Sequence, residues 1–526
     1  MKTEIMCLRI LLTVLSTLLF NLCFPDGRFP HLAWIAMVPW FLALRGAAPG
    51  TGFLLGLLYG LAGWFSSIWW LAGGVENWFH YGAVASWLIA FSFCVYHAAA
   101  YAVFGFLHGV FQWPDKRFGA PAASACLTVL VCLSPAVPGN ITHSLYNQPL
   151  FIQLLDLGGV SLLFFVIALV NWLSADLIRW KLRKEKFIPV VISLVLIFAF
   201  VCGYGKFRLD ELNAMEKNAP GEHTVRIAAV QPNLPLGPDY HDRSRTQMGI
   251  FKSAVARTRE IMLQDKQIDL AVWPEIPLPV GCQCGIQKQA GFVDVVRQTG
   301  RPLIIGCQET GPGKKPLFFN AAMLIEKDGG CGAGYRKRIL VPFSEYLPYE
   351  REFSFLRRIF KRGASYSRGT DAVVMDIGRG RRIIPSICYE ATFSHTIRDG
   401  ARLGGNIIVN MVDDAWFGEN DASLIHMSLA LFRSVEYRMP YVRATNSGVG
   451  VFVRATGEIV PGSITPLFKT AATIHTLYVP QKRSPYFHLG DAFLYFLLFG
   501  LLTGLAVRML RRIPALSRRK AIPGKQ

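Results

Sequence analysis

The stretch Arg382–Glu390, which reads RIIPSICYE, contains an apolar, partly β-branched run that ends at Cys388. Such a run predicts a buried strand that delivers a thiol to the start of a loop. A cysteine in this setting either packs as a small buried side chain or acts as a nucleophile. Its neighbours in the fold decide between these two interpretations.

Two further strand-like stretches introduce ionisable residues. Residues 269–275, DLAVWPE, end at Glu275, and residues 335–343, YRKRILVPF, contain Lys337. A cysteine attacks as its thiolate and therefore needs a neighbouring base or cation. We expect Glu275 to take the thiol proton, and Lys337 and the backbone N–H of Tyr389 to stabilise the oxyanion of a tetrahedral intermediate. Glu, Lys and Cys together predict acyl transfer through a thioester.

Each of these residues also has a plain structural interpretation. Glu275 is equally typical of a surface carboxylate. Lys337 lies between Arg336 and Arg338 and fits a solvated basic run, and composition does not decide which of the three points inward.

The motifs WPE, YxKxxLVPF and CYE, taken together, resemble the Glu-Lys-Cys triad of the nitrilase superfamily over roughly residues 224–477. The stretches 341–348, VPFSEYLP, and 413–418, DDAWFG, narrow the resemblance to the apolipoprotein N-acyltransferase family, over nearly the whole chain. The resemblance implies an α/β/β/α sandwich and selects Lys337 as the lysine of the triad. It also places Glu345 as a second carboxylate that orients this lysine.

Four nearby residues are assigned less directly. Tyr389 is expected to act through its backbone donor, and Glu390 either takes a direct part or is a structural ion-pair partner. Tyr240 stands where the family usually has a tryptophan, which makes a stacking or gating role uncertain. Ser344 replaces a glycine of the family and puts the local backbone geometry in question.

The composition of the 526-residue chain indicates a membrane protein, with 52% hydrophobic and 17% charged residues. The net charge is +20, and the basic residues crowd beside apolar stretches and at the C-terminus. This distribution favours contact with anionic lipid headgroups and argues against binding of nucleic acid. Eight membrane spans are predicted, at about residues 6–23, 31–44, 52–71, 84–107, 120–136, 155–177, 187–203 and 492–510.

Basic residues alternate between the gaps that separate these spans. By the positive-inside rule, both termini face the cytoplasm and the insert between the seventh and eighth spans faces outward. The predicted fold is therefore a multi-pass α-helical membrane domain with an α/β/β/α sandwich inserted before the last span. The predicted parts are a seven-span domain at 1–204, a periplasmic nitrilase-like catalytic domain at 205–486, the eighth span at 487–511 and a basic cytoplasmic tail at 512–526.

Residues 353–362 alternate aromatic or aliphatic with basic side chains. This pattern is typical of an amphipathic helix at a membrane surface. The helix is either a lid for lipid, hinged at Gly363 and Gly369, or it packs on its own domain.

Four cysteines of the insert, Cys282, Cys284, Cys307 and Cys331, lack the second Cys-x-x-Cys or paired histidines of a metal site. We expect no metal and no cofactor, and a disulfide among these four in an oxidising compartment. His395 and His426 are interpreted as structural.

The resemblance implies a ping-pong enzyme of lipoprotein biosynthesis in the bacterial cell inner membrane. Its donor would be the sn-1 acyl chain of a phospholipid, with phosphatidylethanolamine expected, and its acceptor the α-amino group of the diacylglyceryl-cysteine of an apolipoprotein. A monomer without nucleic-acid partners is expected. Two alternatives stay open: a membrane-anchored nitrilase-type amidase acting on a small soluble substrate, and a non-catalytic component of lipoprotein binding or export.

Overall fold

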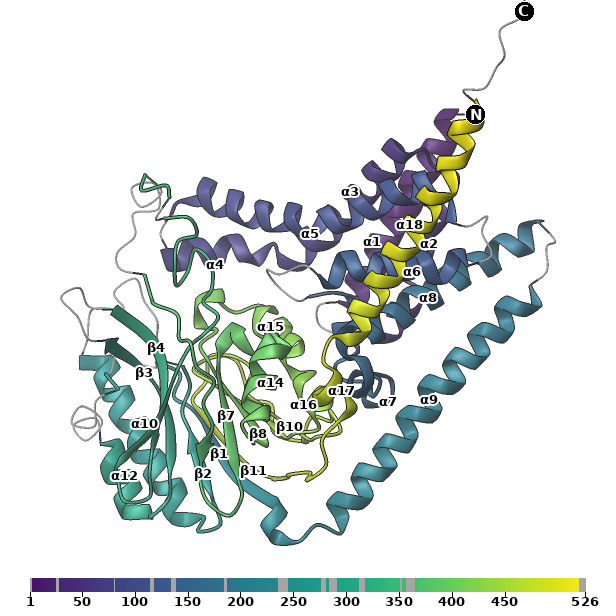
Figure 1. Ribbon diagram of the computed structural model, residues 1–526. Coiled ribbons are helices and arrows are strands. Elements are labelled where there is room, and N and C mark those ends of the chain that lie inside the picture. The colour runs from purple at the N-terminus through teal and green to yellow at the C-terminus, as the bar shows by residue number, and fades with distance from the viewer. Residues whose placement is uncertain are drawn as a thin grey trace, which may run out of the picture.

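A computed structural model of the protein describes residues 2–24, 28–79, 81–113, 118–133, 139–183, 187–234, 245–275, 281–282, 291–311, 317–350, 352–355 and 365–519. Figure 1 shows a bundle of helices in its upper part and a layered α/β unit in its lower part. Helix α9 runs down beside both parts and connects them.

The helices of the bundle account for the predicted membrane domain. Among the described residues, six helices are long and apolar enough to cross a membrane: α1 (Lys2–Cys23), α3 (Pro49–Ile68), α5 (Ala83–Phe111), α8 (Leu155–Arg183), α9 (Ile188–Lys217) and α18 (Ala492–Arg519). Two shorter apolar segments, Pro30–Leu44 and α6 (Gly119–Cys132), fall at the other two predicted spans. The expectation of a multi-pass helical domain is confirmed, with eight apolar segments of which two are short.

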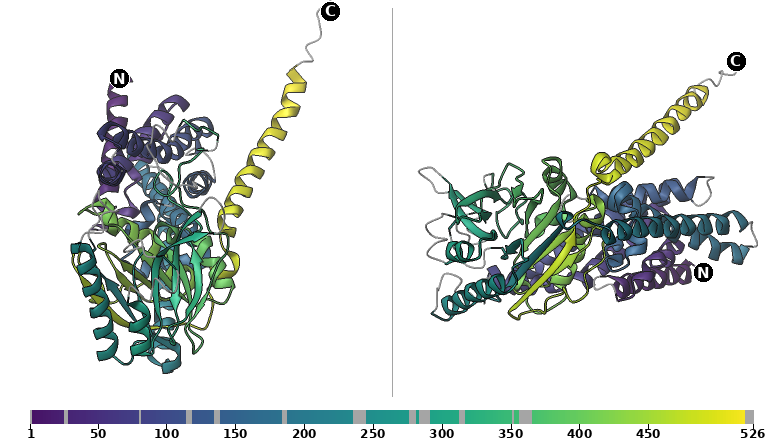
Figure 2. Two further views of the ribbon diagram at one scale, coloured as in Figure 1. Left: turned by 90° about the vertical axis from the view of Figure 1, so that its left-hand side faces the viewer. Right: turned by 90° about the horizontal axis from the view of Figure 1, so that it is seen from below.

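Several details of these helices differ from a plain series of spans. The second apolar segment divides into a 3-10 helix, η1 (Pro30–Trp34), and α2 (Val38–Leu44), because Pro39 is tolerated only in the first turn of a helix. Helix α9 continues to Lys217, well past its apolar stretch. Helix α18 packs on the bundle through Leu494 and Leu497, and Arg508 still lies over the ring of Phe111 on α5, while the end of the helix projects beyond the bundle (Figure 2).

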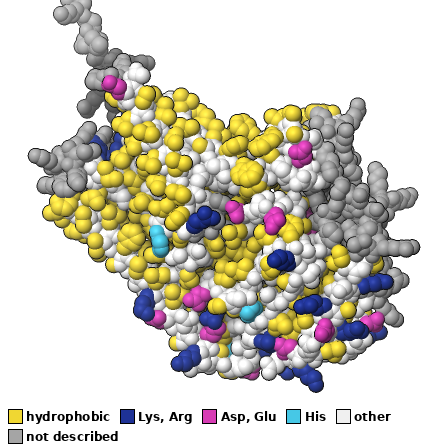
Figure 3. Space-filling view, turned by 180° about the vertical axis from the view of Figure 1, so that it is seen from behind, with side chains coloured by type: hydrophobic (Ala, Val, Ile, Leu, Met, Phe, Trp, Pro, Cys, Tyr) yellow, Lys and Arg dark blue, Asp and Glu magenta, His cyan; other side chains and the backbone are white. Residues whose placement is uncertain are grey.

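Apolar side chains are exposed on the outer faces of the bundle. In Figure 3, hydrophobic side chains gather over the upper part of the molecule, whereas charged side chains are scattered over its lower part. Leu54 on α3, Leu196 on α9 and Phe499 on α18 are each more than half exposed. Exposure of apolar surface on this scale is characteristic of a membrane-embedded protein.

Helices α3 and α5 approach each other at glycines. A Cβ atom on Gly52 or Gly56 would lie 2.1 Å from a backbone oxygen of the partner helix, and one on Gly105 would lie 2.0 Å from the oxygen of Gly52. Small residues allow such close contact in membranes. The contact fixes the relative positions of the two helices that contribute Trp64 and Phe93 to the cavity described below.

Two sheets form the centre of the α/β unit. The first has the order β11-β1-β2-β3-β4-β5, and the second has the order β10-β9-β8-β7-β6. The strands of the first are β1 (Thr224–Gln231), β2 (Leu270–Val272), β3 (Leu303–Gly311), β4 (Leu317–Ile325), β5 (Cys331–Arg336) and β11 (Ala471–Tyr478). Those of the second are β6 (Met375–Asp376), β7 (Arg382–Ile387), β8 (Ile407–Val412), β9 (Tyr441–Thr445) and β10 (Val451–Val453).

Strands β1, β2 and β3 are parallel, as are β7, β8 and β9. Strands that are buried on both faces of a sheet need apolar side chains throughout. This requirement explains the continuous apolar runs that predicted them.

Helices cover the outer face of each sheet. Helices α10 (Arg245–Gln264) and α12 (Phe292–Thr299) share an apolar core with the first sheet. Helices α14 (Ser394–Arg402), α15 (Ala422–Leu431) and α16 (Arg433–Tyr437) share one with the second sheet, and a third core lies between the sheets. The unit is therefore an α/β/β/α sandwich, as the sequence predicts.

The sandwich and the membrane bundle share one apolar core. Side chains of α14, α15 and α16 belong to the same buried cluster as those of the membrane helices. A buried ion pair crosses the junction, because Arg438 Nη2 lies 2.6 Å from Asp156 Oδ2 on α8. Arg208 Nε of α9 lies 2.9 Å from the same oxygen. The two parts are thus packed as one body.

Candidate active site

A cavity of about 340 Å³ lies between the sandwich and the membrane helices. The sandwich contributes ionisable and polar side chains to its wall, among them Glu275, Asn320, Lys337, Glu345 and Cys388. The membrane bundle contributes apolar side chains, namely Phe24, Trp64, Ile68, Leu71 and Phe93. The cavity thus brings together the three residues of the predicted triad.

Cys388 begins the turn η5 (Cys388–Thr392) directly after strand β7. Its φ angle is +56°, a left-handed value that L-residues rarely adopt and that costs of order 1–3 kcal/mol. Such strained residues cluster at functional sites. Burial and the carboxylate of Glu275 raise the pKa of the Cys388 thiol, although Lys337 opposes them. The resting sulfur is therefore protonated.

Lys337 directly follows strand β5 and points into the cavity. Its Nζ lies 3.1 Å from Glu275 Oε1 and 2.9 Å from Glu345 Oε2. Burial alone would lower the pKa of Lys337, but these two carboxylates outweigh it and raise the pKa. Lys337 is therefore an ammonium ion inside the protein.

The two basic neighbours of Lys337 point elsewhere. Arg336 Nε donates to Glu309 Oε2 at 2.9 Å, and Arg338 Nη1 donates to Asp399 Oδ2 at 2.8 Å. Of the three basic residues in this run, Lys337 is the one that faces Cys388.

Glu275 is almost fully buried, and three donors reach its carboxylate. Oε1 accepts from Lys337 Nζ and from Asn320 Nδ2 at 2.7 Å, while Oε2 accepts from the backbone N–H of Asp413 at 3.1 Å. The three donors come from the interior of strand β4 and from the residues that directly follow strands β5 and β8. They hold the carboxylate in one orientation, so the surface interpretation of Glu275 is wrong.

Glu345 is held in the same way. It accepts from Asn320 Nδ2 at 2.8 Å and from the backbone N–H of Val341 at 2.9 Å, in addition to Lys337. The backbone of this loop is left-handed at Phe343, whose φ is +61°. Phe343 lies one residue before Ser344, the position at which the family usually has glycine. Ser344 itself lines the cavity.

Glu390 lies beneath the cavity and connects its two sides. Its Oε2 accepts from the N–H of Ile387, and its Oε1 accepts from the N–H of Arg338. These are the residues immediately before Cys388 and immediately after Lys337. The buried carboxylate therefore fixes the loop of Cys388 relative to the loop of Lys337, and it does so through backbone N–H groups.

Tyr389 follows the nucleophile and lines the cavity. Its ring packs edge-on against Phe393, with 4.9 Å between the ring centres. This packing holds the ring of Tyr389 against the turn that begins at Cys388.

Some sequence-based assignments fall outside the described residues. These are Tyr240, Cys284 and most of the predicted amphipathic segment, residues 356–362, with its hinge Gly363. Within the described part of that segment, Phe353 and Phe355 are about half exposed and are not in a helix. At Gly369 a Cβ would lie 2.2 Å from the backbone oxygen of Arg336, so close packing requires a glycine there.

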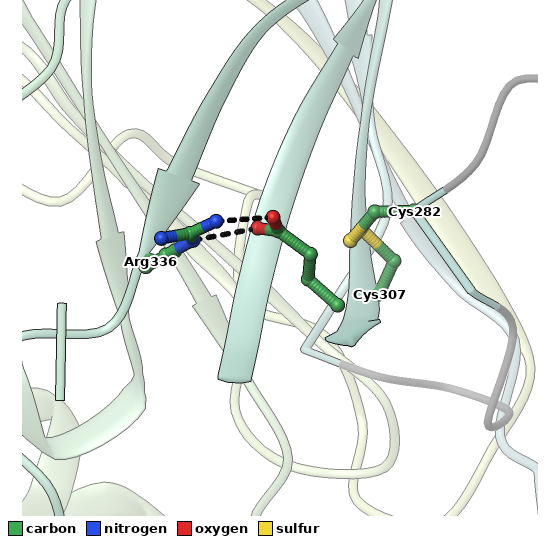
Figure 4. Close-up of a disulfide and its surroundings, with 4 residues drawn as sticks. Cys282, Cys307 and Arg336 are labelled. Carbon is green, nitrogen blue, oxygen red and sulfur yellow. Dashed lines mark hydrogen bonds and ion pairs between the residues drawn. A yellow bond between two sulfur atoms is a disulfide. The ribbon is translucent and has the colours of Figure 1, made fainter. Parts of the chain in front are cut away.

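A disulfide joins Cys282 to Cys307, with 5.3 Å between the Cα atoms (Figure 4). It connects the chain that follows Glu275 to strand β3. Cys331 is also disulfide-bonded. The expectation of a disulfide among the four cysteines of the insert is confirmed.

A histidine lies close to Cys388. Donor atoms of Cys388, Asp414 and His426 lie within 4.8 Å of one another. A divalent cation would need the oxygens of Asp414, but His426 contacts one of them at 2.8 Å and Arg443 contacts the other at 2.6 Å. A guanidinium in this place makes the three residues a poor cation site.

Comparisons with known proteins agree with this architecture. Residues 16–173 match the family model described as apolipoprotein N-acyltransferase N-terminal domain, and residues 226–475 match the model described as carbon-nitrogen hydrolase. An apolipoprotein N-acyltransferase of Geobacter metallireducens is 28% identical over 494 residues, which is 92% of each chain. The chain belongs to the apolipoprotein N-acyltransferase family.

Further similar proteins include another member of this family. Apolipoprotein N-acyltransferase 1 of Treponema denticola is 26% identical over 541 residues and covers 92% of this chain and 93% of its own. Among solved structures, a variant of the Nesterenkonia AN1 amidase from the nitrilase superfamily is 20% identical, with a TM-score of 0.37, and covers 53% of this chain and 97% of its own. The resemblance to apolipoprotein N-acyltransferases that the motifs indicate is thus confirmed over both parts of the chain.

Sequence reasoning missed Asn320, which contacts both carboxylates of this apolipoprotein N-acyltransferase site. Strand β4 reads LFFNAAMLI, and Asn320 interrupts an otherwise apolar run. A buried polar residue in such a strand needs a partner. That interruption was the available signal.

Proposed function

We propose that the protein transfers the sn-1 acyl chain of a phospholipid to the α-amino group of the diacylglyceryl-cysteine of an apolipoprotein, through a thioester on Cys388. Its membership of the apolipoprotein N-acyltransferase family supports an acyltransferase of lipoprotein maturation with lipid and lipoprotein substrates. We also propose that the donor carries a phosphatidylethanolamine headgroup and that the enzyme is a monomer.

One observation supports a lipid donor above all. The cavity that contains Cys388 has a wall of membrane-helix side chains, including Trp64, Leu71 and Phe93. Burial of an acyl chain is favourable by about 0.8 kcal/mol per CH₂, so a chain gains nothing by leaving the bilayer for a polar site. A small soluble amide would have no use for such a wall.

In the proposed first half-reaction, Glu275 accepts the thiol proton of Cys388 while the sulfur attacks the ester carbonyl. The ammonium of Lys337 and the N–H of Tyr389 stabilise the oxyanion. The C–O bond then breaks, and Glu275 returns the proton to the leaving oxygen. A lysophospholipid leaves, and the acyl chain remains on the sulfur.

In the second half-reaction, the amine of the apolipoprotein attacks the thioester. The C–S bond breaks, an amide forms and the sulfur regains a proton through Glu275. Since the lysophospholipid leaves before the apolipoprotein amine reacts, the kinetics are ping-pong. Asn320 and Glu345 support this cycle by holding Glu275 and Lys337 in place.

We further propose that the sandwich faces the periplasm of a bacterial inner membrane and that both termini face the cytoplasm. The distribution of basic residues supports this orientation. The Cys282–Cys307 disulfide adds support, because disulfides persist in oxidising compartments.

The decisive experiment uses the full-length enzyme in vesicles of phospholipid with a labelled sn-1 chain. Wild type is expected to acquire a label that hydroxylamine removes, and Cys388→Ala is expected to acquire none. Cys202→Ala, which changes a cysteine outside the cavity, serves as the matched control and should be labelled like wild type. Wild-type enzyme that stays unlabelled would refute the thioester, and labelling only by small amides would favour an amidase.

A further inference from the structure

A buried histidine–aspartate pair lies beside Cys388 and takes no part in the cycle proposed above. His426, on helix α15, and Asp414, after strand β8, are 8% and 2% exposed. His426 lines the same cavity as Cys388 and Glu275. The sequence interpretation of His426 as structural does not explain why it faces the cavity.

The contacts of Asp414 determine which ring nitrogen of His426 carries the proton. His426 Nδ1 lies 2.8 Å from Asp414 Oδ1. Asp414 Oδ2 accepts from Arg443 Nη2 and from Ser423 Oγ, both at 2.6 Å. Burial alone would raise the pKa of Asp414, but Arg443 and His426 lower it to about 2. An ionised Asp414 accepts a hydrogen bond from Nδ1–H, so the proton of the neutral ring stays on Nδ1 and Nε2 keeps a lone pair.

This second nitrogen is buried and has no hydrogen-bond partner among the described residues. A buried polar atom without a partner is unfavourable, so Nε2 is available to a group that enters the cavity. The charged groups that act on the imidazole include Arg443, Asp414 and Glu275, and the sulfur of Cys388 lies within 4.8 Å of a ring nitrogen. Burial and Arg443 lower the pKa of His426 against the opposing effect of Asp414, so the ring is neutral at pH 7.

The second half-reaction requires two proton acceptors. An α-amine has a reference pKa of about 7.7–8.0 and so enters largely as an ammonium. Acyl transfer from the thioester to R–NH₃⁺ gives an amide, which keeps one N–H, a Cys388 thiol and one released proton. Two protons leave the nitrogen, and Glu275 takes only the one that ends on the sulfur.

We propose that His426 Nε2 accepts the proton that the acceptor ammonium must lose to attack the thioester, while Asp414 holds the ring in the required tautomer. This inference rests on the proposed function and adds to it a base for the second half-reaction alone. The proton taken by His426 then passes to solvent, and the proton lost as the C–N bond forms reaches the sulfur through Glu275.

The test is the variant His426→Asn in the full-length enzyme in phospholipid vesicles. The amide of asparagine still donates to Asp414 from a position close to Nδ1 but provides no base. Acylation of Cys388 by labelled phospholipid is measured first. Transfer from the thioester is then measured at pH 7 with two acceptors, a synthetic diacylglyceryl-cysteine peptide, which is mostly an ammonium, and hydroxylamine, which is already neutral.

We expect transfer to the peptide to slow about 100-fold, the lower end of what general-base catalysis contributes, while acylation and transfer to hydroxylamine change less than about 3-fold. His475→Asn, the same substitution on strand β11 outside the cavity, should leave all three rates unchanged. The acylation step in the same preparation reports that the variant is folded.

Three outcomes would overturn the inference. Peptide transfer at the wild-type rate would show that His426 is not the base. Equal slowing with both acceptors, or a matching loss in acylation, would show that His426 only shapes the cavity. Wild-type enzyme that forms no thioester would refute the proposed function itself, and this inference with it.

Discussion

The two walls of the cavity differ in how their side chains are held. On the sandwich wall, the carboxylates Glu275 and Glu345 are each fixed by several hydrogen bonds, as Glu275 is by Lys337, Asn320 and a backbone N–H. On the membrane wall, rings pack on rings, as Trp64 does on His97 with 4.1 Å between ring centres. Trp70 of helix α4 (Trp70–Phe79) and Phe417 of η6 (Ala415–Phe417) meet where the walls join.

This difference separates two tasks. Hydrogen bonds are directional, so the strand ends fix the geometry of the reaction. Apolar packing depends mainly on shape and area, so under the proposed function the helices would select an acyl chain without fixing its orientation. Substitutions on the sandwich wall should therefore change rates, and those on the membrane wall should change which donor is used.

The largest expected effect is that of Lys337→Met. It removes the cation that stabilises the oxyanion and leaves two buried carboxylates side by side, so we expect thioester formation to slow about 1000-fold. Single-turnover labelling of Cys388 measures this rate. Arg336→Met, whose side chain points toward Glu309, is the matched control and should remain within about 3-fold of wild type. Normal labelling of Lys337→Met would remove the lysine from the mechanism.

The next largest expected effect is the pH dependence of Cys388 alkylation. The pKa of this thiol is raised, so it is neutral below its raised pKa and the thiolate fraction grows with pH. We expect alkylation of the resting enzyme by iodoacetamide to accelerate about tenfold per pH unit, or about 100-fold from pH 7 to pH 9. A rate that levels off below pH 7 would mean instead that Lys337 already holds a thiolate.

A smaller loss is expected for Asn320→Leu. The substitution removes one hydrogen bond from each of two carboxylates while it keeps a similar volume. We expect the lost hydrogen bonds to raise the activation free energy by about 2 kcal/mol, which corresponds to about 30-fold slower thioester formation. Single-turnover rates again provide the measurement, with circular dichroism to compare the folds. A wild-type rate would show that Lys337 alone holds Glu275 and Glu345.

The smallest effect concerns the membrane wall. Trp64→Ala opens the apolar side of the cavity, so we expect the preference among donor chain lengths to change about tenfold while kcat for the best donor hardly changes. Competition between phospholipids of different chain length measures this preference. Trp87→Ala on the lipid-facing side of α5 is the control and should leave the preference as it is. A fall in kcat for every donor would contradict the division of tasks.

The sequence predicts more of the residues on the sandwich wall than on the membrane wall. The strand that ends at Cys388 follows from an apolar run, but the choice of Lys337 over Arg336 and Arg338 needed the resemblance, because the three differ only in where they point. Nothing in a linear pattern tells which apolar helix faces a cavity and which faces lipid. Trp64 therefore looked like any other residue of a predicted span.

Polar residues inside apolar elements were the signal that went unused. Asn320 interrupts strand β4, and His426 lies on a helix in which every residue except Leu424 is buried. Their partners are distant in sequence, since Asn320 contacts Glu275 and Glu345, and Cys388 precedes His426 by many residues. Only the folded chain shows that these groups converge.

The apolar core shared by helices α14–α16 and the membrane helices has a practical consequence for experiments on a fragment. A fragment limited to residues 205–486 would keep the strand ends but uncover the faces of α15 and α16 and leave Arg438 without Asp156. Removing one partner of a buried ion pair costs about 3–5 kcal/mol, comparable with the whole stability of many domains. An inactive soluble fragment would thus report its own unfolding and would not bear on the chemistry of the intact enzyme.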